Sequence, residues 1–251
     1  MGSPERKTCC EQKASQRNKY FNGKLMTARD FEDEQAYHIE KRKHHHRYLH
    51  GYGIVCGLRV VPTHPAQRRY VIVEPGVALD PWGREIVVCE PTECELIEGG
   101  EPERCDKSNS LYIVLEYRET GAEPIPIPGE PCSSEEENIA PSRIRETFQL
   151  SLRPEPPDEE DEVSRRICKT FINAIREGVR QEELHRLLCA CVSHPCHPRA
   201  PDPALTLARI DIPGEGSITE GQIDNCSHRH LALSVEQILR ILLCIAMHPA
   251  R

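Results

Sequence analysis

The feature that most constrains this chain is a helix signal that changes into strand signals at a cluster of glycines. No proline or glycine occurs from 28 to 50, and acidic residues come early in this segment while basic residues come late. That charge order suits the helix dipole. Gly51 follows at the position just past the last helical turn, where glycine is favoured. We therefore predict a helix over 28–50 that leads directly into a β-strand.

The start of this helix has a signal of its own. Thr27, with Asp30 three residues later, resembles a capping box with aspartate in place of the longer glutamate. The helix lacks a continuous apolar face, because Phe31 and its other apolar residues fall on different sides. A helix that is polar nearly all round is stabilised by ion pairs or by a packing partner. We favour packing against a partner subunit, with Thr27 and Phe31 as candidate interface residues.

Short β-branched runs begin at Ile54 and are separated by proline and glycine turns, which predicts a meander of antiparallel strands. A proline-rich extended connection is expected at 121–132. Alternating patterns predict further strands at 111–119, 143–152 and 204–213. Helical spacing predicts helices at 164–179, 181–192 and 234–247. The last of these is apolar enough to be buried.

Together these signals predict an α+β protein. A long N-terminal helix is expected to pack on a small antiparallel β-barrel or sandwich, with additional helices toward the C-terminus. The expected organisation is a flexible tail, a helix with a β-domain, an acidic linker, and a helical and β C-terminal part that packs on the same core or stands alone. These parts cover 1–19, 20–153, 154–163 and 164–251.

Three glycines lie within seven residues where the predicted helix meets the first strand: Gly51, Gly53 and Gly57. This spacing suits a tight corner in which the backbone passes close to another element. A phosphate-binding loop is excluded, because the helix precedes the strand and neither G-x-G-x-x-G nor a Walker lysine is present. The three glycines are therefore candidate structural residues.

A second turn, D-P-W-G-R at 80–84, lies between two predicted strands. Asp80 resembles a catalytic carboxylate, but its place in a D-P-x-G turn explains it without chemistry. We count Asp80, Gly83 and Arg84 among the structural residues of the corner. No G-x-S-x-G elbow and no cysteine–histidine protease pattern is present, so the sequence indicates no catalytic residue.

The histidines near the end of the predicted helix are a weak metal signal. His44, His45 and His46 are consecutive, so their side chains point about 100° apart and cannot all bind one ion. His46 and His50 share a face at i and i+4, but no glutamate lies between them. A polar helix end that meets a dipole or a partner carboxylate explains these residues more simply.

The densest set of possible metal ligands lies in CACVSHPCHP at 189–198. Zinc prefers four sulfur or nitrogen ligands, and one turn-rich loop can supply several. The candidate ligands are Cys189, Cys191, Cys196 and His197, with Cys226 as a distant addition. Zinc is the candidate cofactor. The C-x-C spacing is tighter than C-x2-C, and small buried cysteines beside a surface His-Pro loop are the competing interpretation.

The chain has 13 cysteines and no apolar segment typical of a secretory signal near its start, which favours reduced thiols or metal ligands over a disulfide framework. Cys89, Cys94 and Cys105 form a further cluster, in which a disulfide is an option if the protein leaves the cell. A net charge of −8 argues against nucleic-acid binding. No apolar run approaches the roughly 20 residues of a membrane span. We expect a cytoplasmic protein.

Several motifs occur in a characteristic order. The most specific lie at 20–60 and 73–88, including G-Y-G-I-V-C-G-L-R-V and V-E-P-G-V-A-L-D-P-W-G-R-E-I. Weaker ones follow at 111–119, 141–152, 205–212 and 225–234. This order resembles a family of bacterial proteins encoded with phage-tail-like contractile injection systems, and modules of phage baseplate and tail-fibre proteins. The histidine-rich stretch at 43–48 and Tyr52, where the family pattern has tryptophan, are departures.

The resemblance implies a non-enzymatic structural subunit of a contractile particle, at the baseplate periphery or as a fibre or cap adaptor. It implies partners among baseplate, spike, fibre, sheath or tube proteins, in a homo- or hetero-oligomeric assembly built in the cytoplasm and released as part of a particle. The residues themselves leave two alternatives open. One is a zinc-binding adaptor or regulatory protein that uses the Cys189–His197 cluster, and the other, less favoured, is a cysteine-dependent enzyme.

Overall fold

The computed structural model describes residues 15–96, 110–126, 139–157, 169–170, 173, 181–192, 202–213 and 216–247. The chain divides into two compact units. One consists of Met1–Tyr37 and Asp158–Ala200, and the other of His38–Pro157 and Pro201–Arg251. The expected boundary at 154–163 is thus one of several crossing points, because the chain returns to the larger unit at Pro201.

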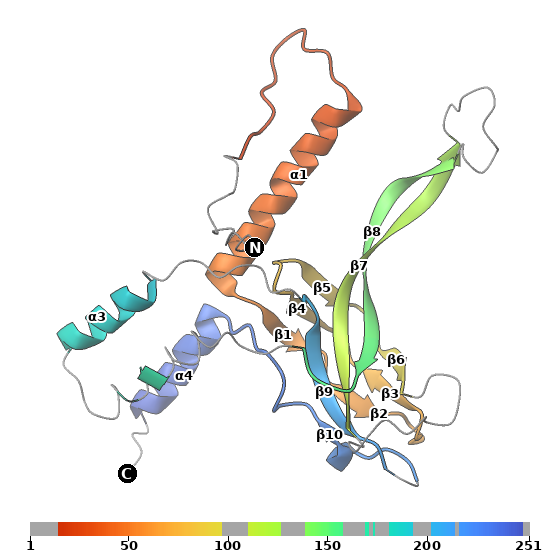
Figure 1. The fold of residues 1–251 in the computed structure, drawn as a ribbon, viewed down its shortest axis with the longest axis vertical. Coiled ribbons are helices and arrows are strands. Elements are labelled where there is room, and N and C mark those ends of the chain that lie inside the picture. The colour runs from red at the N-terminus through yellow and green to blue at the C-terminus, as the bar shows by residue number, and fades with distance from the viewer. Residues whose placement is uncertain are drawn as a thin grey trace, which may run out of the picture. The chain divides into compact units, whose positions relative to one another are not determined.

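The elements follow the predicted order, with a helix first and short strands after it (Figure 1). The first half of the chain contains α1 (Ala28–His45), the π-helical turn η1 (His46–His50), β1 (Gly53–Gly57), β2 (Val60–Pro62), β3 (Tyr70–Val73), β4 (Gly76–Leu79), β5 (Glu85–Val88) and β6 (Thr92–Glu95). The second half contains β7 (Ser110–Pro126), β8 (Ile139–Arg153), α3 (Gln181–Val192), β9 (Leu205–Asp211), the short helix η3 (Glu220–Gln222), β10 (Ile223–Asp224) and α4 (Val235–Met247).

The strands of the larger unit form three antiparallel sheets, ordered β1-β4-β5, β2-β3-β6 and β10-β9-β7-β8. The α+β class is confirmed, and among the described strands no sheet closes into a barrel. β9 joins the sheet by pairing with the start of β7. That pairing is why the segment after Pro201 shares the core of the earlier strands.

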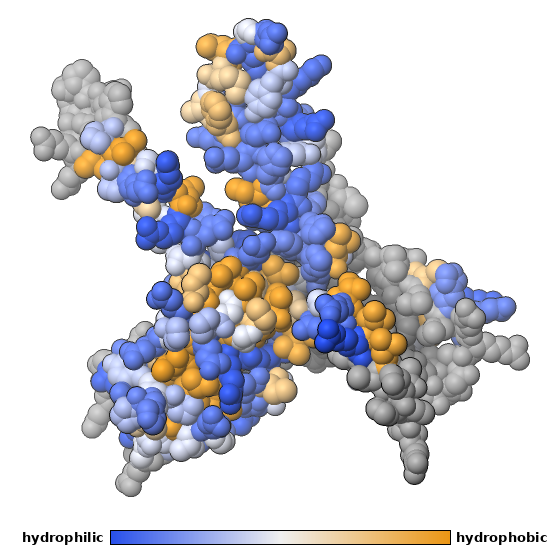
Figure 2. All heavy atoms as spheres, turned by 180° about the vertical axis from the view of Figure 1, so that it is seen from behind, coloured by the Kyte–Doolittle hydropathy of each residue, from blue (hydrophilic) through white to orange (hydrophobic). Residues whose placement is uncertain are grey.

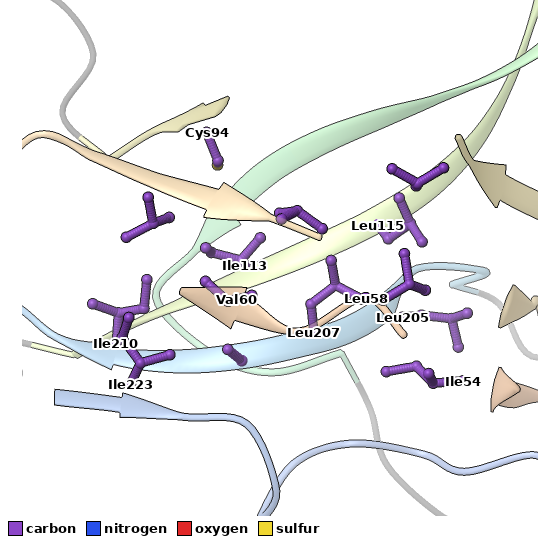
Figure 3. Packing of buried hydrophobic residues seen from close by; sticks show 14 of the residues in the cluster. Ile54, Leu58, Val60, Cys94, Ile113, Leu115, Leu205, Leu207, Ile210 and Ile223 are labelled. Carbon is purple, nitrogen blue, oxygen red and sulfur yellow. The ribbon is translucent and has the colours of Figure 1, made fainter. Parts of the chain in front are cut away.

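One continuous hydrophobic cluster holds the three sheets together (Figure 3). Leu58 and Val60 come from the segment after β1, Ile113 and Leu115 from β7, and Leu207 from β9. All five side chains are at most 1% exposed. Burial of a branched aliphatic side chain of this size stabilises the folded state by about 1.5–3 kcal/mol. The meander and the later strands therefore fold as one cooperative module.

The ribbon formed by β7 and β8 is longer than the sequence predicts. The proline-rich segment beginning at 121 was expected to be an extended connection, and β7 continues through it to Pro126 and pairs with β8. Pro124 lies opposite Pro141. Since proline has no backbone N–H, two prolines can face each other only where the ladder needs no donor. Prolines at such positions are compatible with a strand, so the extended segment is part of β7 as far as Pro126.

The predicted first helix is present, but its last turn changes character. α1 ends at His45, and the predicted final residues form the π-helical turn. No residue of α1 is buried, which matches the missing apolar face, and Figure 2 shows a largely hydrophilic surface along it. Phe31 is exposed. Packing of this helix on a partner subunit stays a prediction.

The cap at the start of α1 takes a different form from a full capping box. The Asp30 carboxylate accepts hydrogen bonds from the Thr27 backbone N–H at 2.9 Å and from the Thr27 hydroxyl at 2.8 Å. Lys24 pairs with the same carboxylate at 2.8 Å. These donors hold the pKa of Asp30 well below its usual range, the Lys24 contact being the largest cause. The hydroxyl of Thr27 therefore serves the carboxylate instead of a helix N–H.

The helix at 234–247 was expected to be buried, and for the described side chains this was wrong. Val235, Ile238, Leu239 and Leu243 on α4 are all exposed. Ser234 caps its start, since the Gln237 backbone N–H donates to the Ser234 hydroxyl and the Gln237 side chain accepts from the Ser234 N–H. Composition indicates that a face is apolar, but it does not supply the surface that covers it. No described helix is both long enough and apolar enough to cross a bilayer.

The described cysteines are free thiols: Cys56, Cys89, Cys189 and Cys226 are exposed, and Cys94 is buried. No disulfide joins Cys89 to Cys94, and Cys105 lies outside the described residues. Burial raises the pKa of the Cys94 thiol to about 11. The thiolate is the reactive form of cysteine. The buried cysteine should consequently behave as an inert core residue.

We predict that Cys94 resists alkylation in the native protein while Cys89 reacts. With a pKa of about 11, only about one Cys94 in a thousand is a thiolate at pH 8, and the group is also shielded. Peptide-resolved mass spectrometry after brief iodoacetamide treatment, with and without urea, measures both residues. Equal labelling of the two cysteines without urea would contradict the packing of β6.

Candidate functional site at the helix-to-sheet corner

The corner glycines sit where α1 and η1 pass into β1. Gly53 and Gly57 have backbone φ angles of +132° and +64°, which side-chain-bearing residues rarely adopt. A Cβ atom on Gly53 would lie 2.6 Å from the His230 carbonyl oxygen, and one on Gly57 would lie 2.1 Å from that of Pro75. These are the close backbone approaches predicted from the spacing. Gly51 also has positive φ, but nothing lies within 4 Å of its Cβ position.

A distant part of the chain runs alongside the start of β1. The Ile54 N–H donates to the His230 carbonyl oxygen at 2.8 Å, and the Ala232 N–H donates to that of Ile54 at 3.0 Å. The rings of Tyr52 and His230 lie face to face, 4.2 Å apart and tilted by 32°. This contact explains why Gly53 must lack a side chain, because the two backbones pass within hydrogen-bonding distance.

The end of the first helix is fixed on the turn between β4 and β5. His46 Nδ1 donates to the Gly83 carbonyl oxygen at 2.9 Å, and its Nε2 lies 3.4 Å from a Glu85 carboxylate oxygen. A Cβ atom on Gly83 would lie 2.3 Å from the Lys43 carbonyl oxygen. Backbone therefore meets backbone here, and the direction of the helix end is set by a contact that only glycine permits.

Asp80 organises that turn from the inside. Its side chain is fully buried, and one carboxylate oxygen accepts from the backbone N–H groups of Trp82 at 2.9 Å and Arg84 at 2.8 Å. The other oxygen accepts from Arg84 Nε at 2.5 Å. The Arg84 guanidinium lies between the rings of Trp82 and Tyr117, 4.6 and 4.5 Å from their centroids. Asp80 and Arg84 thus act as a structural ion pair, as the D-P-x-G turn predicts.

Arg229, which sequence reasoning did not single out, makes hydrogen bonds to four other residues. Its Nε donates to the Leu207 carbonyl oxygen at 2.5 Å and its Nη1 to that of Gly57 at 3.4 Å. Its Nη2 donates to the Leu58 carbonyl oxygen and, at 3.0 Å, to Asn225 Oδ1. Desolvation lowers the pKa of this partly buried guanidinium. Arg229 therefore connects three segments that are far apart in the sequence.

Asn225 also joins its segment to β2, because its side-chain amide pairs with the Val60 backbone as a neighbouring strand would. Its Oδ1 accepts from the Val60 N–H at 2.8 Å, and its Nδ2 donates to the Val60 carbonyl oxygen at 2.9 Å. Asp224 accepts from the backbone N–H groups of Cys226 and Ser227. A hydrogen bond from the Ser227 side chain, which is the largest cause, and these backbone bonds lower the pKa of Asp224 to about 2. The segment 225–234 was noted only as a weak motif. An arginine and an asparagine after a strand were the available signals.

The histidines are arranged differently from the expected i, i+4 pair. The π-helical turn brings His50 Nε2 to 3.1 Å from His45 Nε2, while His46 faces Gly83 and Glu85. The contact of His46 with Glu85 is of the kind expected for a polar helix end that meets a carboxylate.

The predicted zinc ligands are only partly described. Cys189 lies exposed on α3, with its sulfur 3.6 Å from His185 Nε2. Cys191 is in the same helix, whereas Cys196 and His197 lie outside the described residues. Cys226 belongs to the other unit. The described part of the chain contains no group of three or more histidine, cysteine or acidic residues arranged to hold a metal ion.

Comparison with known proteins adds no assignment. No protein-family model matches the chain, and a search of curated proteins found no match.

We predict that Gly57→Ala lowers the free energy of unfolding by about 3 kcal/mol. The left-handed backbone costs an alanine about 1–2 kcal/mol, and the displaced Pro75 carbonyl adds about as much again. Urea unfolding measures the change. Gly221→Ala is the matched control, since nothing lies within 4 Å of its Cβ position. Equal midpoints for the two variants would refute the close approach.

We also predict that Arg229→Met lowers the free energy of unfolding by about 2–4 kcal/mol, because it leaves buried carbonyl oxygens without their donors. Arg59→Met is the control. Arg59 is exposed, and its ion pair with Glu220, at 3.5 Å, is worth at most about 1 kcal/mol. Thermal and urea unfolding of both variants test this. If Arg229→Met changes the free energy of unfolding as little as Arg59→Met does, the hydrogen bonds of Arg229 are not needed for stability.

Proposed function

We propose that the protein is a non-enzymatic structural subunit of a contractile phage-tail-like particle, acting through protein–protein contacts at the baseplate periphery or as a fibre or cap adaptor. The family resemblance of 20–60 and 73–88 motivates the class of particle. The observation that carries the proposal is an apolar stripe on the β7/β8 ribbon that leaves the core, is interrupted by the Glu119–Glu146 pair, and ends in exposed apolar residues.

The stripe follows from the register of the two strands. Residues directly opposite each other share a face, and every second pair lies on the same side. Counting outward from the Leu115–Leu150 pair, that face carries the pairs Tyr117–Phe148, Glu119–Glu146, Gly121–Ile144 and Ile125–Ala140. The first pairs pack against the core. Ile144 and Ile125 lie farther out and are 72% and 48% exposed.

The exposed end of the ribbon has the character of an interaction surface. Figure 2 shows hydrophobic residues interspersed with hydrophilic ones along this arm, and Ile139 adds an exposed side chain on the opposite face. Soluble chains rarely leave apolar residues grouped at the end of an extended element unless another surface covers them. A two-stranded ribbon that exposes isoleucines beyond its own core is suited to lie on a neighbouring subunit.

The corner supplies the rigidity that such a subunit needs. Fixed contacts at Gly53, Gly57 and Gly83 join the end of α1 to the sheets, so a load on the helix is passed to the β-module without a flexible linker. The carboxylate of Asp80 is used to build a turn. Both features support a role in assembly over a role in catalysis. We propose assembly of the subunit in the cytoplasm and release with the particle.

The second candidate is a zinc-binding adaptor or regulatory protein. The observation in its favour is the 3.6 Å contact between the Cys189 sulfur and His185 Nε2 on α3, which places two possible zinc ligands one helical turn apart. Stoichiometric zinc that is lost on Cys189→Ala would support it. Zinc binding would not exclude a place in a particle.

The prediction from the ribbon concerns incorporation. In cells that produce the particle, the tagged chain should sediment with sheath and tube proteins, and the variant Ile125→Glu with Ile144→Glu should lose most of this association. A charge placed in a desolvated contact without a partner costs several kcal/mol, so incorporation should fall by about tenfold or more. Quantitative immunoblots of sedimented particles measure it.

Thr120→Glu is the matched control. Thr120 is exposed, lies on the other face of the ribbon and pairs with Arg145, so the new carboxylate is tolerated. Urea unfolding of all variants checks that the module remains folded. A wild-type chain that stays monomeric beside assembled particles would refute the proposal. Equal incorporation of the apolar-face variant would exclude the ribbon as the contact.

A further inference from the structure

Two exposed imidazoles meet at the end of α1. Nε2 of His45 and Nε2 of His50 are 3.1 Å apart, and the ring centroids are 4.9 Å apart. On a regular α-helix, residues five apart differ in direction by about 140°, so they could not meet. The π-helical turn His46–His50 changes this, because its hydrogen bonds join residues five apart. The pairing of the two rings is therefore a product of this turn.

The separation of the two nitrogens suits a metal ion. Zinc–nitrogen bonds are about 2.0–2.1 Å long, and two of them at angles between about 90° and 110° place the nitrogens about 2.9–3.4 Å apart. The observed 3.1 Å lies within this range, so neither ring needs to move far. Both side chains are exposed, so water can complete the coordination. We propose that His45 and His50 form a two-histidine site for a divalent late transition-metal ion such as Zn²⁺.

The chemistry of binding requires one proton to move. Without an ion, Nε2 of one ring donates its hydrogen to Nε2 of the other. When the ion binds, that ring carries its proton on Nδ1 instead, and both Nε2 lone pairs face the metal. Imidazole nitrogen suits Zn²⁺, Ni²⁺ and Cu²⁺, whereas Mg²⁺ and Ca²⁺ prefer oxygen. The site should therefore discriminate strongly against the alkaline-earth ions.

The charges around the two histidines also favour selectivity for nitrogen-binding metal ions. Lys43 and Arg47 flank His45 and His46 in the sequence, the Lys43 ammonium lies 3.0 Å from Glu40, and Glu85 faces His46. A basic surrounding repels any divalent ion, so only ions that form strong bonds to nitrogen can bind here. This site uses none of the cysteines or histidines at 189–197.

The turn is held in place before any ion arrives. His46, between the two ligands, donates to the Gly83 carbonyl oxygen, and Gly83 lies against the Lys43 carbonyl. These contacts fix the backbone on both sides of His45. A ligand pair that is already oriented loses little conformational freedom on binding, which raises affinity.

The test is site-resolved histidine modification of the full chain with diethyl pyrocarbonate, with and without Zn²⁺, read by peptide mass spectrometry. At a Zn²⁺ concentration about ten times the dissociation constant, mass action leaves about a tenth of the sites empty, so modification of His45 and His50 should slow about tenfold. His64, at a distant turn, should react at the same rate throughout. Mg²⁺ at the same concentration should have no effect.

Variants decide whether the two residues act together. In His50→Ala, Zn²⁺ should no longer protect His45, and in His45→Ala it should no longer protect His50. His44→Ala is the matched control from the end of α1. In this variant Zn²⁺ should still protect both His45 and His50. Circular dichroism confirms that each variant is folded. The proposal is overturned if Zn²⁺ protects neither residue in the wild-type chain, or if either residue stays protected when the other is alanine.

Discussion

The corner depends on a partly buried cation that is held by backbone carbonyl groups. The Arg229 guanidinium joins the carbonyl oxygens of Gly57 and Leu58, just after β1, to that of Leu207 in β9. Removing such a charge from water is expensive unless every donor finds an acceptor. The hydrogen bonds to neutral acceptors offset that cost only when the three segments are in register. The hydrogen bonds of Arg229 therefore stabilise the fold only when the three segments are in their observed arrangement.

Around this cation, the module separates two tasks. Aliphatic side chains between the sheets supply most of the stability, and the polar contacts at Asp80, Asn225 and His46 decide where helices and turns attach. Elements that leave the module, such as the outer part of the β7/β8 ribbon, gain nothing from the core and keep exposed apolar residues. The division is that of a stable centre with outward arms, which suits a subunit whose neighbours complete its packing.

Local signals in the sequence were sufficient for many of the elements, although not for the outer part of the β7/β8 ribbon. The long helix, the strand meander and the D-P-x-G turn all follow from capping, charge order and turn chemistry, which act over a few residues. Long-range facts were out of reach. The pairing of Asn225 with Val60 spans 165 residues, and no local pattern encodes it. The π-helical turn was not predicted either, so the sequence placed His50 beside His46, whereas its nitrogen lies next to that of His45. The apolar face of α4 was expected to be buried, because the sequence does not show which surfaces are available to cover it.

The prolines of the ribbon have one more consequence. β8 is the edge of its sheet, and edges of this kind invite backbone pairing with other chains. Pro124 and Pro141 remove two N–H donors from the outer part of both strands. A crowded population of identical subunits would thereby be discouraged from stacking into fibrils through their ribbons. Any docking at that end must then be selective, since it has to be read from the shape and chemistry of side chains.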